Sequence, residues 1–185
     1  MRDERGGVLV FALLMLPLLL LLFAYLGDLA AETVVQTQLH YALESALDDA
    51  AQQVDPLAAS HNCIVLDAPQ ATQAFESGLM AALKSPGPAQ GGVPNWDFYP
   101  GWNLALFQGP LVVDGFQVYN TNYLVQNSNG TYSCLTTSAL GTTTPWGTVL
   151  DRPMVYADLK ATVILPTGST QTLDVFADVG ANQAN

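Results

Sequence analysis

The side chains that could support catalysis are few and widely separated in this chain. His40 and His61 are the only histidines among 185 residues, and neither lies near a serine or cysteine in a recognised nucleophile motif. Asp48 and Asp49 are adjacent, but consecutive side chains on a helix diverge by ~100°, so the two carboxylates cannot act on one bond. We therefore expect no enzyme. A hydrolase would require the fold to bring His61 to a serine or cysteine beside an acid.

Motifs that hold cofactors or metals are also missing from the sequence. It contains no P-loop, HExxH or GxGxxG motif and no Cys/His spacing typical of zinc. Turns rich in acids and asparagine, such as Asp114-Gly115 and Asn120–Asn129, leave a calcium site as an alternative, although none has EF-hand spacing. We expect no cofactor and no bound metal.

Cys63 and Cys134 are the remaining groups with a distinct chemistry. In an oxidising compartment they would form one disulfide, whose long loop would stabilise the fold by ~4 kcal/mol in the chain-entropy model. The alternative is a pair of buried, unpaired thiols. The choice between them depends on the compartment in which this part of the chain lies.

Charge is distributed unevenly along the chain. The net charge of −11 argues against a nucleic-acid partner, because proteins that bind nucleic acid carry a basic surface. Arg2 and Arg5 precede a long apolar run, and the next basic residue is Lys84. The positive-inside tendency therefore places the N-terminus in the cytoplasm and the bulk of the chain outside.

Residues 8–27 form this apolar run, which contains no charged side chain. About 20 such residues, at ~1.5 Å each, cross the roughly 30 Å hydrocarbon layer of a bilayer. A cleavable secretory signal is the alternative, but its apolar region is shorter, ~7–15 residues, and the best cleavage site here, after Ala31, is poor. We expect a retained transmembrane helix that follows a short cytoplasmic leader over residues 1–7.

Residues 28–54 are expected to continue this helix as an amphipathic stalk. Apolar side chains recur there every three or four residues and form one stripe, made of Val35, Leu39, Leu43, Ala46, Ala50 and Val54. Pro17 and Gly27 are expected bend points, and Asp55-Pro56 should end the helix. Because the stalk has no lysine or arginine for internal ion pairs, it depends on packing its stripe against another element.

The remaining residues, 55–185, are expected to form one extracytoplasmic head of the α+β class. A helix is predicted over 69–84, and the residues from 86 to 96 are expected to be a turn-rich linker. Short strands are predicted over 111–119, 122–126 and 131–136. The clearest strand pattern is a hairpin over 154–165 and 170–179, whose alternating apolar residues give one face to bury. We predict that this antiparallel sheet packs on the stalk.

Aromatic side chains are densest in the segment that follows the linker. Trp96, Phe98, Tyr99 and Trp102 lie in a connection rich in proline and glycine, where exposed rings would form a recognition loop. The alternative is a loop that the same rings pin to the core. The exposure of these side chains separates the two interpretations.

The opening ERGGVLVFALLMLPLLLLL resembles the N-terminal signature of TadE/TadG-like proteins of the Flp (tight-adherence) pilus systems. Arg5-Gly6, Phe11-Ala12-Leu13 and Leu16-Pro17-Leu18 match that signature in order, and Val10 stands where the family has a glutamate. The wider plan of short leader, apolar helix, amphipathic extension and β-rich head is similar to that of type IV pilins. This resemblance implies cleavage after Gly6 or Gly7 by a prepilin peptidase.

The resemblance also implies that the apolar helix packs in a filament core after leaving the membrane, through side chains that include Phe11, Leu14, Pro17, Leu20 and Phe23. We therefore expect a pilin-like subunit, a minor pilin or a pilus-assembly protein, located in the inner membrane or in a surface pilus. Its expected partners are the membrane and other pilin subunits, identical or different, or assembly components. The alternative is a membrane-anchored binding or sensor domain.

Overall fold

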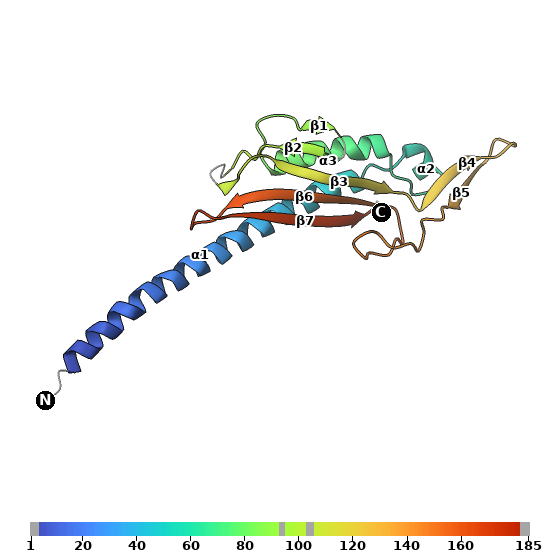
Figure 1. The fold of residues 1–185 in the computed structure, drawn as a ribbon. Coiled ribbons are helices and arrows are strands. Elements are labelled where there is room, and N and C mark those ends of the chain that lie inside the picture. Colours follow the sequence, from blue (N-terminus) through green and yellow to red (C-terminus); the bar gives the residue numbers. More distant parts are fainter. Residues whose placement is uncertain (1–3, 93–94, 103–105, 182–185) are drawn as a thin grey trace.

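The computed structural model describes residues 4–92, 95–102 and 106–181, with side chains from Val10 onwards. A long N-terminal helix extends from a head in which helices lie against one face of an antiparallel sheet (Figure 1). The chain is therefore of the α+β class. The predicted layout, a long apolar helix followed by a C-terminal antiparallel sheet, is confirmed.

Helix α1 (Glu4–Ala51) is one continuous helix of 48 residues. At ~1.5 Å per residue it is about 70 Å long. It runs through Pro17 and Gly27 without interruption, so neither expected bend point divides it. It ends at Ala51 rather than at Val54, which corrects the predicted boundary of the stalk.

The early end of α1 has a local cause in backbone pairing. The N–H of Asp55 donates to the carbonyl of Val65 at 2.8 Å, and the N–H of Asp67 donates to the carbonyl of Gln53, also at 2.8 Å. Val54, between them, forms an isolated bridge with Leu66. These bonds require extended backbone, so the helix stops before residue 53.

Two shorter helices follow, each with an aspartate cap. In α2 (Pro56–Ser60) the Asp55 carboxylate accepts from the N–H of Leu57 at 2.8 Å, and in α3 (Ala68–Ala82) Asp67 accepts from that of Gln70 at 3.2 Å. Helix α3 packs along α1, and Gly78 makes this approach close. A Cβ at Gly78 would lie 3.2 Å from the Cα of Ala46 on α1.

Five strands form the main sheet in the order β1-β2-β3-β6-β7, with antiparallel neighbours throughout. Their bounds are β1 (Gln90–Gly92), β2 (Asn95–Phe98), β3 (Leu111–Tyr119), β6 (Met154–Ile164) and β7 (Thr170–Gly180). Strands β4 (Asn122–Gln126) and β5 (Tyr132–Thr136) pair with each other and form a separate small sheet. Strand β1 and the first half of β2 lie where a linker was predicted. Strand β2 pairs with β3 through residues 96–98, and β1 pairs with β2.

The core lies between α1, α3 and the inner face of the sheet. Strands β6 and β7 pair from Met154 opposite Gly180 to Ile164 opposite Thr170, as the predicted hairpin requires. Their inward side chains are buried, namely Val155, Ala157, Leu159, Ala161, Val163, Leu173, Val175 and Ala177. They share one apolar cluster with the α1 stripe, in which Val35, Leu39 and Leu43 are 4%, 0% and 0% exposed and Val54 is partly buried. The predicted packing of the hairpin on the stalk is confirmed.

This packing predicts that truncating the stripe destabilises the head. Leu43→Ala removes fully buried methyl groups and should lower the free energy of unfolding by about 2–5 kcal/mol. Leu20→Ala is the matched control, because Leu20 lies on the same helix and is 61% exposed. Its effect should stay within about 0.5 kcal/mol. Urea unfolding in detergent, monitored by tryptophan fluorescence, measures the free energy of unfolding of both variants. An equal loss in Leu43→Ala and Leu20→Ala would contradict the packing of the stripe.

Candidate functional site

The first half of α1 exposes apolar side chains around the whole helix. Phe11, Leu14, Leu20 and Phe23 are 61%, 66%, 61% and 66% exposed, and Pro17 is exposed as well. By length and composition, α1 could cross a membrane, and it is the one such helix in the part of the chain that the structure describes. A helix that is apolar on all sides is typical of a membrane span or of the interior of an assembly. We call residues 10–27 the apolar segment.

The glycines at which processing is expected lie just before this segment. Gly6 and Gly7 fall within the first turns of α1. Residues 1–3 of the expected leader lie outside the described residues. Cleavage after either glycine stays a prediction.

The head holds α1 where the apolar segment ends. The carboxylate of Asp28 accepts hydrogen bonds from the N–H of Thr167 at 3.0 Å and from its hydroxyl at 2.6 Å. One turn later, Glu32 accepts from the side-chain amide of Gln171 at 2.7 Å. These bonds join α1 to the β6–β7 turn and to the start of β7. Val35 is then the first buried side chain along the described part of α1, so the helix passes from exposed to packed over residues 28–35.

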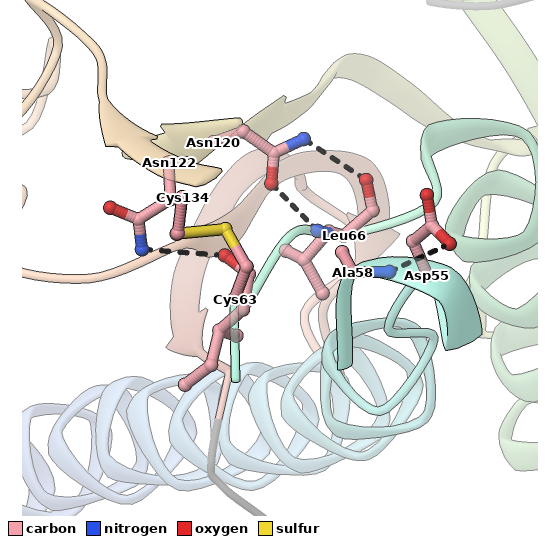
Figure 2. Close-up of a disulfide and its surroundings, with 8 residues drawn as sticks. Asp55, Ala58, Cys63, Leu66, Asn120, Asn122 and Cys134 are labelled. Atoms are coloured by element: carbon pink, nitrogen blue, oxygen red, sulfur yellow. Dashed lines mark hydrogen bonds between the residues drawn. A yellow bond between two sulfur atoms is a disulfide. The ribbon is translucent and has the colours of Figure 1, made fainter. Parts of the chain in front are cut away.

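The expected disulfide between Cys63 and Cys134 is present, with a Cα–Cα distance of 5.4 Å (Figure 2). It links the segment after α2 to β5 across a sequence separation of 71 residues. Asn120 supports the same junction, because its Oδ1 accepts from the N–H of Leu66 at 2.7 Å and its Nδ2 donates to the Leu66 carbonyl at 3.0 Å. The small β4–β5 sheet is thereby tied to the helical part of the head.

The aromatic group divides between the core and the surface. Trp96 and Phe98, on β2, are only 5% and 0% exposed, and Trp96 stacks on Phe75 of α3 at 5.7 Å. Tyr99 is 41% exposed, and Trp102 is half-buried. Trp96 and Phe98 are therefore not part of an exposed recognition loop. Strand β2 pairs with β3, and both rings point into the core.

The two histidines considered for catalysis lie on different elements and contact different side chains. His40 lies on α1 with its Nε2 3.3 Å from Glu44 Oε1, one turn further along the helix. His61 stacks on Tyr132 of β5, with ring centroids 4.5 Å apart. Among the described residues, no group of three or more histidine, cysteine or acidic side chains could hold a metal ion.

The outer face of the sheet, opposite α1, carries a polar group that sequence reasoning missed. Tyr156 and Asp158 are two residues apart on β6, and Trp146, from the loop before that strand, stacks on Tyr156. Burial raises the pKa of Tyr156. Burial, with a hydrogen bond to Asp174 and the charge of that carboxylate, raises the pKa of Asp158 to about 7. The alternation in β6 indicated this face, but the loop that covers it has no periodic signal.

Comparison with models of protein families, with curated proteins and with solved structures finds no match to this chain. Function is therefore inferred from the geometry. Its most distinctive feature is the apolar segment, which continues without a break into a helix held by the head.

Removal of the disulfide should destabilise the head. Replacing both Cys63 and Cys134 by serine opens a long loop and should cost about 2–5 kcal/mol of unfolding free energy. Urea unfolding of oxidised, reduced and doubly substituted protein measures the loss. The reduced and the substituted protein should behave alike, and equal stability of all three forms would contradict a structural role for the bond.

The raised pKa of Asp158 predicts a pH dependence of stability. Because the folded pKa of about 7 lies above the ~3.9 of an unfolded aspartate, the folded state binds more protons between these values. The contribution of this group to stability therefore falls as pH rises from about 4 to 7. Asp158→Asn should flatten the dependence of the urea midpoint on pH in this window. An unchanged slope in the variant would contradict the assignment.

Proposed function

We propose that this protein is a structural subunit or assembly component of a pilin-like cell-surface filament. The observation that supports this most is the continuity of α1. One helix carries an exposed apolar segment at its N-terminal end and the central stripe of the head's core at its other end. A subunit that moves from a membrane into a filament needs this arrangement, because the helix must be rigidly joined to the domain that the filament displays.

The membrane stage follows from the charge and the length of the apolar segment. Arg2 and Arg5 remain on the cytoplasmic side by the positive-inside tendency, and the head lies outside. The disulfide supports this orientation, since such bonds persist in oxidising compartments. The hydrogen bonds at Asp28 and Glu32 then lie at the membrane surface, where they set the position of the head on its anchor.

The filament stage uses the same side chains in a different apolar environment. Neighbouring subunits would cover the apolar segment with their own, replacing lipid contacts by helix packing. The resemblance of residues 4–22 to the TadE/TadG-like signature supports this assignment and implies leader cleavage after Gly6 or Gly7. Val10 stands in place of the family's glutamate, so this subunit would lack any contact that depends on that carboxylate.

A membrane-anchored binding domain is the second candidate, favoured by a groove of about 500 Å³ beside α1. Tyr41 of α1, Lys84 after α3 and Trp102 line it. Of the aromatic side chains expected to form a recognition loop, only Trp102 lines this groove. A ligand here would contact the head without any contribution from the apolar segment.

The filament proposal predicts that the chain is recovered with sheared surface filaments. A tagged wild-type chain should appear in the sheared fraction by mass spectrometry, with six or seven residues removed if the leader is processed. Leu20→Lys should abolish recovery, because a cation at the centre of the apolar segment costs about 2.5–3.5 kcal/mol in a bilayer. Val149→Lys is the control, since Val149 is similarly exposed, at 55% against 61% for Leu20, but lies in the head.

Two outcomes would count against this function. Recovery of the wild-type chain only from detergent-extracted membranes would exclude a filament subunit and leave an assembly role or the binding domain. Recovery of Leu20→Lys in the sheared fraction at the wild-type level would exclude assembly through the apolar segment.

A further inference from the structure

Strand β7 is the open edge of the main sheet. It has 11 residues and, within the part of the chain that the structure describes, pairs on one side only, with β6. The opposite edge strand, β1, has three residues, two of them glycine. A long edge strand presents a row of unpaired N–H and C=O groups on which another strand can add. In Figure 1, β7 bounds the sheet on the side away from β3 and β1.

Acidic side chains line this edge. Asp174 and Asp178 project from β7 on the face opposite α1, on either side of Phe176, which is 51% exposed. Strand β7 contains no lysine, arginine or proline. The edge is therefore open in its backbone and negative in its side chains.

A groove of about 570 Å³ runs beside the same edge, between β7 and α1. Its lining includes Val175 from β7, and Tyr41 and Glu44 from α1. Glu44 adds a carboxylate on this inner side, and Tyr41, 66% exposed, adds an apolar surface. Asp174 and Phe176 line the groove as well, so it meets the edge from both faces, and an added strand would lie between Asp174 and Glu44.

We propose that the β7 edge binds an extended, basic segment of a partner polypeptide as a sixth strand. Main-chain hydrogen bonds would provide the affinity, and the acids on both sides would select lysine or arginine in the segment. A second copy of this chain does not fit. In a β7–β7 pair the aspartates of the two edges would face and repel one another. Lys160 does not supply a basic edge, because it lies on β6, which is paired on both sides.

This proposal does not depend on assembly of the apolar segment, and it can be tested on the full chain in detergent. The probe is a synthetic peptide of 11 residues, the length of β7, in which pairs of lysines alternate with pairs of valines, so that both faces of the added strand carry lysine. It should slow amide hydrogen exchange in residues 170–180, measured by mass spectrometry. Two control peptides replace the lysines by glutamate or alternate valines by proline, which removes main-chain donors.

Charge-reversing substitutions give the sharper comparison. Glu44→Lys combined with Asp178→Lys should weaken binding of the basic peptide by about tenfold, from the loss of two opposite-charge contacts. These positions leave the hydrogen bond between Asp158 and Asp174 intact. The matched control, Asp48→Lys with Asp97→Lys, makes the same change of charge on α1 and on β2 and should bind like the wild type.

Three results would overturn the proposal. They are no protection of residues 170–180 by the basic peptide, equal protection by the glutamate or proline peptide, and equal weakening in the two double variants. Protection by the basic peptide alone, lost only in the Glu44/Asp178 variant, is the expected result. Unchanged unfolding midpoints of both variants establish that the head is folded in each.

Discussion

The structure depends on one apolar contact, the packing of the α1 stripe under the β6–β7 hairpin. Leu39 and Leu43 are fully buried there, against strands whose inward residues are small or branched. This contact makes a long helix part of a domain rather than a tether, since burial of such side chains contributes ~1.5–3 kcal/mol each. The direction of the apolar segment relative to the head follows from it.

The other features of the head stabilise or extend this contact. Asp28 and Glu32 hold α1 to the hairpin where the burial begins. The disulfide links the small β4–β5 sheet to the segment after α2. Because α1 and α3 cover the inner face of the sheet, other molecules can approach the sheet at its outer face and at its edges, of which β7 is the longer. Anchoring, proposed for one end of the molecule, and recognition, proposed for this edge, therefore use different surfaces.

The elements with strong periodicity could be predicted from the sequence. The stripe from Val35 to Leu43 and the alternation from Val155 to Val163 each identify a buried face. Because each face needs an apolar partner, the two are expected to pack against each other. The end of α1 could not be predicted, because it depends on backbone bonds between residues 53–55 and 65–67 that are distant in sequence. Strand β2 was missed for a similar reason. Its glycine-rich flanks indicate a linker, whereas pairing with β3 buries Trp96 and Phe98.

We propose that helix α1 lies in an apolar environment over its first half and beside the head over its second. Spin labels at positions 14, 20 and 41 of the full chain in lipid nanodiscs test this directly, by collision with oxygen and with a water-soluble nickel chelate. Labels at 14 and 20 should collide with oxygen and be shielded from the chelate, because they lie in lipid, while the label at 41 should show the reverse. Free access of the chelate to positions 14 and 20 would contradict it.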